Sequence, residues 1–333
     1  CPSLTTLYDG RNVAEFPVLA EKTSEARSEW RTMFPGVSRS PACSPHNPPL
    51  YMTSFRTWFS SHAPEIDALL LDVDGVLMTS RTPLPGSREL LTELRGRQFP
   101  FLLLTNDGCN SPAQKTAYLE QGGLRFSIDE LVSSSHPLAE LVQERGWQGT
   151  TFFVMGQLGD PCYAREAGIQ TTRDLGALAD ENCLGILVGE ESYDWEHTIA
   201  EVFNFLIHHR DAPVVVPNPD VYFPVKGGRL HPASGATVGF VQFLCQTYGF
   251  AIEPIFLGKP HAPIFRHAHR EVERRLGRTL PPSRLLVLGD SLASDIRGGR
   301  DYGTRTGLML TGVTTPAMLA TAATQPELVF TAL

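Results

Sequence analysis

The stretch Leu69-Leu70-Leu71-Asp72-Val73-Asp74-Gly75-Val76-Leu77 decides the fold. An apolar run ends in two carboxylates one residue apart, and a glycine follows. A short apolar run bounded by turn residues is typical of a buried strand in a parallel sheet. Ligands of open parallel sheets bind beyond the carboxyl ends of the strands. Asp72 and Asp74 are therefore expected at a functional site, because burying an uncompensated carboxylate costs on the order of several kcal/mol.

Strand and helix patterns alternate from Ala68 onward, which indicates a doubly wound α/β fold with a parallel sheet. Further strands are expected at 101–104, 131–133, 255–257 and 285–288, and helices at 87–97, 112–120 and 264–276. Three apolar strands end in polar or charged residues, at Asp72, at Thr105-Asn106 and at Gly289-Asp290. This repetition argues against the alternative that the first pair of aspartates is only a polar turn.

The chain divides into four expected parts. Residues 1–50 form an N-terminal extension with a possible helix at 21–34 and several prolines, and 51–148 form the first part of the core. Met52, Phe55, Trp58 and Phe59 recur at helical spacing and predict a short helix before the first strand. Residues 149–253 predict an inserted α/β cap, with strands at 151–155, 184–188 and 214–217 and helices at 161–167 and 196–208. Residues 254–333 complete the core.

The composition excludes several classes of protein. The 333 residues carry a net charge of −8, and the absence of a Lys/Arg run argues against a nucleic-acid partner. No apolar run approaches the roughly 18 residues of a membrane helix. The six cysteines are scattered, which favours reduced thiols and a cytoplasmic location. Because the chain begins with Cys1 rather than Met, removal of a preceding segment is expected.

The polar strand ends suit phosphoryl transfer. A carboxylate such as Asp72 can attack phosphorus and form an aspartyl-phosphate, but it repels a phosphate dianion. At ~4 Å and an effective dielectric of ~20, this repulsion is about 8 kcal/mol. Oxygen ligands from Asp72 and Asp290 suit Mg²⁺, which would cancel it. Lys259 supplies a second positive charge, Thr105 can hold phosphate oxygens, and Asp74 can act as general acid and base.

Together these motifs resemble the haloacid dehalogenase (HAD) superfamily of aspartyl-phosphate phosphatases over residues 55–333. The inserted region resembles the large α/β cap of the class IIA branch, which includes p-nitrophenyl phosphatases and nucleotide monophosphatases. The motifs that carry this second resemblance are Val154-Met155-Gly156, Val188-Gly189-Glu190, Asn218-Pro219-Asp220, His231-Pro232-Ala233-Ser234-Gly235-Ala236 and Leu257-Gly258-Lys259-Pro260.

The resemblance implies roles for single residues. Asp72 would be the nucleophile and a Mg²⁺ ligand, Asp74 the acid/base and a ligand through its backbone carbonyl, and Asp290 a direct ligand. Asp295 would lie behind the direct ligands of the metal site or contact the metal through water. The residues expected to bind the phosphate or the substrate are Thr105, Asn106, Asp107, Gly108, Asn218, Asp220 and Lys259. Relatives often pair through their caps, so a homodimer is expected.

Two positions depart from the family pattern. The loop after Thr105 reads Asn-Asp-Gly-Cys-Asn, where Asn-Asn or Asn-Gly-Gly is commoner, and Phe223 stands where some pyridoxal phosphate-cleaving relatives have a histidine. The main prediction is a Mg²⁺-dependent phosphomonoester hydrolase acting on a small phosphorylated metabolite. A phosphomutase or another phosphoryl transferase on the same scaffold, and a receiver-like protein that only binds phosphate, remain alternatives. A dehalogenase is disfavoured because it needs no acid at Asp74.

Two other candidate sites are set aside. His267 and His269 are two positions apart on a helix and do not face each other, so no histidine metal site is expected. Cys109 lies beside the phosphate loop, but no basic residue adjoins it in the sequence, so an inert thiol is expected.

Overall fold

The computed structural model describes residues 50–52, 54–79, 81–179, 183–190, 193–225 and 229–333. The expected helix at 21–34 and nearly all of the extension lie outside these residues. All the elements below belong to one unit of the chain, Asn47–Leu333.

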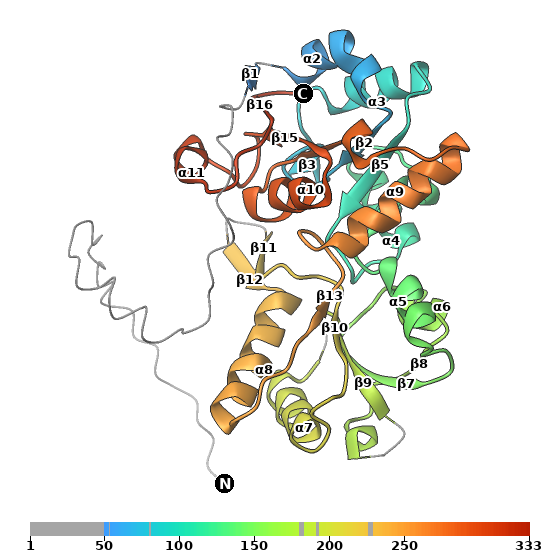
Figure 1. The fold of residues 1–333 in the computed structure, drawn as a ribbon, viewed down its shortest axis with the longest axis vertical. Helices are drawn as coiled ribbons and strands as arrows, with labels where there is room; N and C mark the ends of the chain where they lie inside the picture. Colours follow the sequence, from blue (N-terminus) through green and yellow to red (C-terminus); the bar gives the residue numbers. More distant parts are fainter. Residues whose placement is uncertain (1–49, 53, 80, 180–182, 191–192, 226–228) are drawn as a thin grey trace, which may run out of the picture. The chain divides into compact units, whose positions relative to one another are not determined.

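A seven-stranded sheet forms the core, in the order β1-β16-β15-β14-β2-β5-β6, and every neighbouring pair is parallel (Figure 1). Its strands are β1 (Leu50–Met52), β2 (Ala68–Leu71), β5 (Phe101–Thr105), β6 (Leu131–Ser133), β14 (Leu285–Gly289), β15 (Arg305–Met309) and β16 (Leu328–Phe330). The expected doubly wound parallel core is confirmed.

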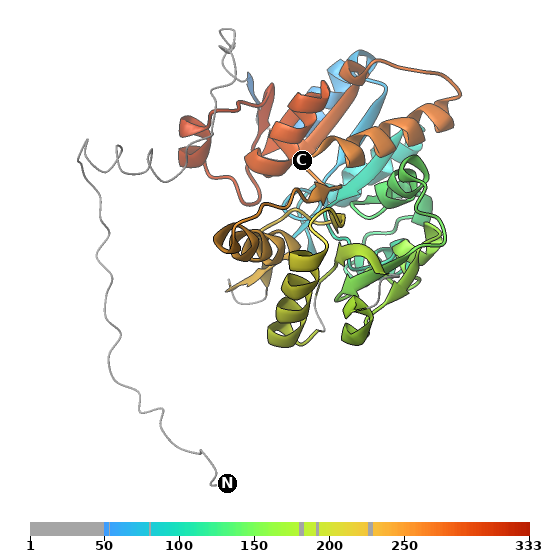
Figure 2. The same ribbon diagram turned by 60° about the horizontal axis from the view of Figure 1, so that its bottom comes forward.

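Alternate residues of the central strands face opposite helical layers. Leu69 and Leu71 pack in one cluster with side chains of α2 (Phe55–His62) and α3 (Ser87–Gly96). Leu70 lies in a second cluster with side chains of α9 (Ala262–Leu276), which runs along the other face of the sheet (Figure 2). Because both faces are covered, the strand is apolar throughout, as its sequence predicted.

A second parallel sheet, in the order β13-β10-β9-β7-β8, is inserted between the two parts of the core. Its strands are β7 (Thr151–Met155), β8 (Gln170–Thr172), β9 (Cys183–Val188), β10 (Val214–Val216) and β13 (Ile255–Phe256). The inserted α/β cap is confirmed. The placement of 255–257 among the core strands was wrong, because Ile255 and Phe256 pair with β10. The expected domain boundary at 254 stays a proposal.

The remaining helices connect or cover the two sheets. They are α4 (Pro112–Gln121), α5 (Pro137–Arg145), α6 (Tyr163–Glu166), α7 (Trp195–His208), α8 (Ser234–Tyr248), α10 (Arg297–Tyr302) and α11 (Pro316–Thr321). Two antiparallel hairpins join β3 (Met78–Thr79) to β4 (Thr82–Pro83) and β11 (Tyr222–Val225) to β12 (Arg229–Pro232). The short helix expected before the first core strand is α2, which buries Phe55, Trp58 and Phe59. Met52, which was expected in the same helix, lies in β1.

A membrane-spanning helix is not found in the described part of the chain, where no helix combines the necessary length and apolar character.

Candidate active site

The three strands whose polar ends were expected to meet are direct neighbours in the core sheet. β2 pairs with β14 on one side and with β5 on the other. Asp72 follows β2, Thr105 is the last residue of β5, and Asp290 follows β14. These residues therefore gather at the carboxyl edge of the sheet, where ligands of parallel sheets bind.

Three carboxylates and one lysine form a buried cluster at this edge. Asp72, Asp290 and Asp295 each offer one carboxylate oxygen, and these oxygens lie within 4.8 Å of one another. Lys259 Nζ donates to Asp72 Oδ1 and to Asp295 Oδ1, each at 2.7 Å, and its side chain is 3% exposed. A single ammonium group leaves a negative excess among three ionised carboxylates, so the cluster favours a further cation.

Burial and the excess of negative charge shift the pKa values of Asp72, Asp290 and Lys259 in this cluster. Burial raises the pKa of Asp72 well above its usual range; Lys259 opposes this, and Asp295 and Asp290 add to it. Burial and the neighbouring Asp295 raise the pKa of Asp290 to about 7. Burial alone would lower the pKa of Lys259, but the two aspartates it bridges raise it. In the metal-free protein, protons therefore compete with cations for these carboxylates.

The oxygens that remain unengaged fit a Mg²⁺ ion. Both oxygens of Asp295 are used, since Oδ1 accepts from Lys259 and Oδ2 accepts from Ser291 N at 3.2 Å. Asp290 Oδ2 accepts from Val313 N at 2.7 Å. Within the described residues, Asp72 Oδ2 and Asp290 Oδ1 have no protein donor. Asp72 and Asp290 therefore each keep one carboxylate oxygen for a cation, a donor type that suits Mg²⁺, while Asp295 holds the lysine in place.

Two glycines allow the chain to close around Asp290. A Cβ atom at Gly75 or at Gly312 would overlap the Asp290 carboxylate, and Gly75 has a φ of +78°. Thr311 Oγ1 donates to Gly75 O at 2.5 Å and joins the two segments. The glycine after the Asp72-Val73-Asp74 motif is thus explained by close approach and by its left-handed backbone.

Asn106, which is expected to bind substrate, also holds the backbone of Lys259 in place. Its Oδ1 accepts from Lys259 N at 2.8 Å, and its Nδ2 donates to Lys259 O and to Asp220 Oδ1, both at 2.9 Å. The amide therefore links the core to Asp220 of the inserted region and fixes the backbone of the lysine. Its role in substrate binding stays a prediction.

In the loop that begins at the end of β5, Thr105 and Gly108 have different roles. Thr105 Oγ1 accepts from Asp107 N at 3.1 Å, and its own hydroxyl proton has no acceptor among the described residues, so it can serve a phosphate oxygen. Gly108 packs tightly, because a Cβ there would lie 2.8 Å from the Ser135 hydroxyl and 3.0 Å from the Ser134 hydroxyl. This tight packing explains why a glycine, which has no side chain, occupies position 108.

Asp107 and Asp74 share a lysine that sequence reasoning missed. Lys115 Nζ lies 2.9 Å from Asp107 Oδ2 and 3.9 Å from Asp74 Oδ2. Burial raises the pKa of Asp107, but the charge of Lys115, with hydrogen bonds from Lys115 and Asn110, lowers it overall. The Asp74 carboxylate is 57% exposed and lies outside the metal cluster, so its expected metal contact through the backbone carbonyl stays a prediction.

The predicted residues of the inserted region form a second polar group. Asn218 Oδ1 accepts from Asp220 N at 2.9 Å, and Asn218 Nδ2 donates to Glu190 Oε1. Burial raises the pKa of Asp220, and burial raises the pKa of Glu190 to about 7. The sequence marked Glu190 only as part of a family motif, although its place two residues after the apolar strand β9, like the carboxylates that follow β2 and β14, was a usable signal.

Glu190 also lines a cavity of about 250 Å³ in the inserted region. The other lining residues are Gly189, Tyr193, Trp195, Phe223, His231, Pro232, Ala233, Ser234 and Thr237. The Phe223 and His231 rings are 5.8 Å apart on the β11–β12 hairpin. The cavity therefore combines aromatic walls with one carboxyl group that titrates near neutrality.

We expect Glu190→Gln to stabilise the protein at pH 8 but not at pH 4.5. The folded wild type keeps its proton up to about pH 7 while the unfolded chain loses it near 4.5, so wild-type stability falls as pH rises through this window. The glutamine variant lacks this loss, so at pH 8 its free energy of unfolding should exceed that of the wild type by up to about 3 kcal/mol. Urea unfolding at both pH values measures this difference, and Glu253→Gln, at an exposed position, is the control. A pH-independent difference would contradict the prediction.

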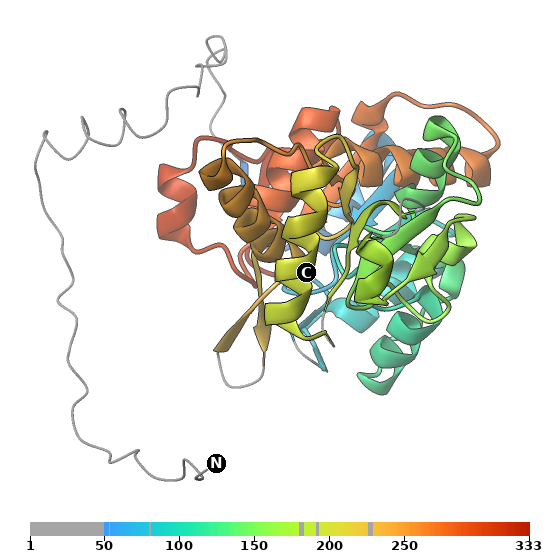
Figure 3. The same cartoon turned by 90° about the horizontal axis from the view of Figure 1, so that it is seen from below.

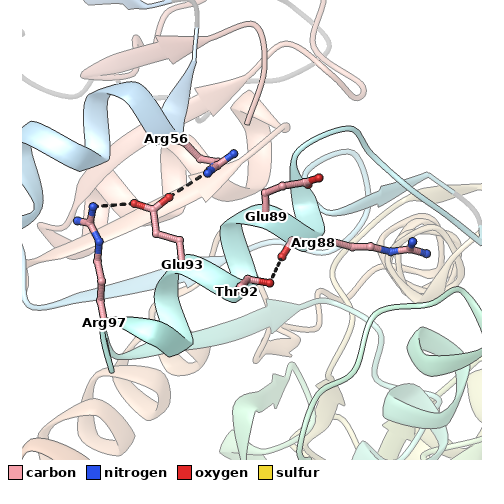
Figure 4. A pocket seen from close by; sticks show the side chains of 6 residues that line it. All are labelled: Arg56, Arg88, Glu89, Thr92, Glu93 and Arg97. Carbon is pink, nitrogen blue, oxygen red and sulfur yellow. Dashed lines mark hydrogen bonds and ion pairs between the residues drawn. The ribbon is translucent and has the colours of Figure 1, made fainter.

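A groove on α2 and α3 is unrelated to the predicted site. Figure 4 shows Glu93 between Arg56 and Arg97, with ion pairs of 3.1 and 2.9 Å. The groove contains none of the residues predicted for catalysis or metal binding, and its charges are largely paired with one another.

Comparisons with known proteins agree with the site. Residues 69–170 match the model of the haloacid dehalogenase-like hydrolases, and residues 256–333 match a second model described as HAD-hydrolase-like. A dihydroxyacetone phosphatase of Corynebacterium glutamicum is 26% identical over 74% of this chain and 82% of its own length. The two family matches include Asp72, Asp74, Asp290 and Asp295, and the first of them extends through β7 of the inserted sheet.

Two solved structures share the fold. The p-nitrophenyl phosphatase of Archaeoglobus fulgidus has a TM-score of 0.66 at 25% identity, covering 81% of this chain and 97% of that one. A glycerol phosphate phosphatase of Mycobacterium tuberculosis in complex with magnesium has a TM-score of 0.66 at 24% identity, covering 80% and 75%. The chain belongs to the haloacid dehalogenase-like hydrolases. Its inserted sheet places it in the class IIA branch, with the p-nitrophenyl phosphatase-like proteins.

Proposed function

We propose that this protein hydrolyses phosphomonoesters of small metabolites through an aspartyl-phosphate on Asp72. The observation that carries the proposal is the Asp72 carboxylate, which is 13% exposed, accepts from Lys259 Nζ at 2.7 Å and lies beside Asp290 and Asp295. A carboxylate in such a position is shielded from water and lies against cationic charge that offsets its repulsion of phosphate.

The proposed reaction has two steps. An Asp72 oxygen forms a bond to phosphorus as the bond from phosphorus to the leaving oxygen breaks, and Asp74 gives its proton to that oxygen. In the second step Asp74 takes a proton from water, whose oxygen attacks phosphorus and releases inorganic phosphate from Asp72. Lys259 and the Thr105 hydroxyl hold the phosphate oxygens during both steps.

Asp72 and Asp290 are proposed to hold Mg²⁺, with Asp295 acting through Lys259 or through water. When bound, the ion supplies positive charge that lets nucleophile and phosphate approach each other. This fits the unengaged oxygens described above, and the related glycerol phosphate phosphatase binds magnesium.

The substrate is proposed to be a small phosphorylated metabolite, such as a sugar or polyol phosphate. The relatives include a dihydroxyacetone phosphatase and acid sugar phosphatases of 26–27% identity. The cavity beside Glu190 has space for a small leaving group, with aromatic rings to pack against it and polar groups to bind hydroxyls. Asn218 and Asp220 would position this cavity relative to Asn106.

A homodimer through the inserted region is also proposed. The exposed aromatic side chains on this pair of helices are Trp195 at the start of α7 and Phe240, Phe243 and Tyr248 on α8. The two helices run side by side in Figure 3, and the Trp195 and Phe240 ring centroids are 5.1 Å apart. Large apolar side chains that are exposed close to one another favour association. A monomeric mass in solution would contradict this proposal.

A cytoplasmic location is proposed from the scattered cysteines.

The deciding experiment follows hydrolysis of p-nitrophenyl phosphate and a panel of sugar and polyol phosphates, with Mg²⁺ and with EDTA. We expect steady turnover with Mg²⁺, at least ~100-fold slower after chelation. Stable labelling without turnover would favour the receiver-like alternative. Transfer of the phosphoryl group to a second substrate hydroxyl would favour a mutase.

A further inference from the structure

A second buried lysine adjoins the proposed site. Among the described residues, Lys115 and Lys259 are the two buried lysines, and the Lys115 side chain is 8% exposed. Lys115 lies in the first turn of α4, after the Ser111 cap and Pro112. A cation is disfavoured at a helix N-terminus, and an unpaired buried ammonium is costly. Its position therefore needs a specific reason.

Asp107 accounts for part of that reason. Its Oδ2 accepts from Lys115 Nζ at 2.9 Å. The same carboxylate also accepts from Asn110 N at 3.1 Å and from Asn110 Nδ2 at 3.1 and 3.0 Å. Asp107 thus has several hydrogen-bond donors without the lysine. The pair fixes the ammonium group at the turn between β5 and α4.

The ammonium also faces Asp74. Lys115 Nζ lies 3.9 Å from Asp74 Oδ2, and it is the only charged partner of that carboxylate in the part of the chain that the structure describes. The Asp74 side chain is 57% exposed on the loop after β2, where it could otherwise occupy several rotamers. Proton transfer requires a rotamer that directs the carboxyl group at the leaving oxygen, so holding that rotamer favours the reaction.

We propose that Lys115, held by Asp107, is a positioning residue that directs the Asp74 carboxyl group at the leaving group. The inference rests on the proposed function, in which Asp74 protonates the leaving oxygen. It also gives a physical reason for Asp107, because a neutral side chain there would leave the buried ammonium without its closest charged partner.

The test compares two leaving groups in the full chain. p-Nitrophenolate leaves without being protonated, whereas an alkoxide such as that of glycerol needs a proton from Asp74. We expect Lys115→Met to lower kcat/KM for glycerol phosphate about 10–100-fold and for p-nitrophenyl phosphate less than ~3-fold. Lys115→Arg should recover part of the loss. A purely structural role would lower both values equally, and that result, or no loss at all, overturns the proposal.

Two further variants keep the test decisive. If Lys115→Met does not fold because Asp107 stays buried and unpaired, the double variant Asp107→Asn/Lys115→Met removes both charges and should show the same difference between substrates. Arg284→Met breaks an ion pair with Asp67 away from the site and should show no such difference. The proposed function is tested separately, by asking whether turnover requires Mg²⁺ and Asp72. If turnover does require both, but Lys115→Met lowers kcat/KM equally for the two substrates, this inference is overturned and the proposed function stands.

Discussion

Asp72→Asn is expected to abolish turnover, with a loss of at least ~10³-fold in kcat for every phosphomonoester that the wild type hydrolyses. An amide oxygen is a poor nucleophile and cannot form the acyl-phosphate. The fold should survive, because the variant removes one of three clustered carboxylates and leaves the Lys259–Asp295 pair at 2.7 Å. Thermal unfolding should therefore occur at the same or a higher temperature, since burial raises the pKa of Asp72 and makes its charge unfavourable there.

The matched control lies just before the other end of the same strand. Asp67 precedes β2 and is paired with Arg284 at 2.9 Å, and that hydrogen bond holds the pKa of Asp67 below its usual range. Asp67→Asn should lower the melting temperature and leave kcat unchanged, which is the opposite pattern to Asp72→Asn. Full activity in Asp72→Asn, checked by mass spectrometry to exclude deamidation, would show that the nucleophile is another residue.

The sequence predicted the parts of the fold that depend on local pattern. β2, β5, β6 and β14 are apolar runs buried on both faces, so their composition identifies them without knowledge of their neighbours. The meeting of Asp72 and Asp290 was predictable because the carboxyl ends of parallel strands lie at one edge. Their grouping with Asp295 and Lys259 required the family resemblance, since Lys259 comes from a different segment.

What the sequence did not reveal depends on neighbours in space. Arg305–Met309 contains an arginine, a threonine and a glycine, and it becomes strand β15 through pairing between β14 and β16. Ile255 and Phe256 form a strand as expected, but a run so short carries no signal for its partner sheet. Lys115 and Glu190 looked like ordinary charged residues, because only the folded chain shows that they are enclosed.

Lys259→Met is expected to damage both activity and stability. The variant removes the ammonium that contacts Asp72 and Asp295 and leaves three carboxylates within 4.8 Å without a cation. Breaking a buried pair in this way costs about 3–5 kcal/mol. Loss of the charge that holds the phosphate should lower kcat about 10²–10³-fold. Urea unfolding and p-nitrophenyl phosphate turnover measure the two effects.

The pH and metal dependence of the stability loss identify its cause. The pKa of Asp290 is already raised to about 7 with the lysine present, so at pH 5 the cluster of the variant holds protons at little cost. At pH 8 it must either ionise beside its neighbours or keep protons that the unfolded chain has lost, and both are unfavourable. Lysine itself stays charged throughout this range in the wild type. The loss in the metal-free variant should therefore be small at pH 5 and full at pH 8, and Mg²⁺ should recover part of it at pH 8.

Lys259→Arg is the matched control, because it keeps the charge and changes the geometry. It should retain most of the stability at pH 8 while losing activity, since a guanidinium cannot donate to Asp72 and Asp295 from the same point. A Lys259→Met protein as stable at pH 8 as at pH 5, without Mg²⁺, would show that these carboxylates do not repel one another. The need for a cation between nucleophile and phosphate, on which the proposed mechanism depends, would then lose its physical basis.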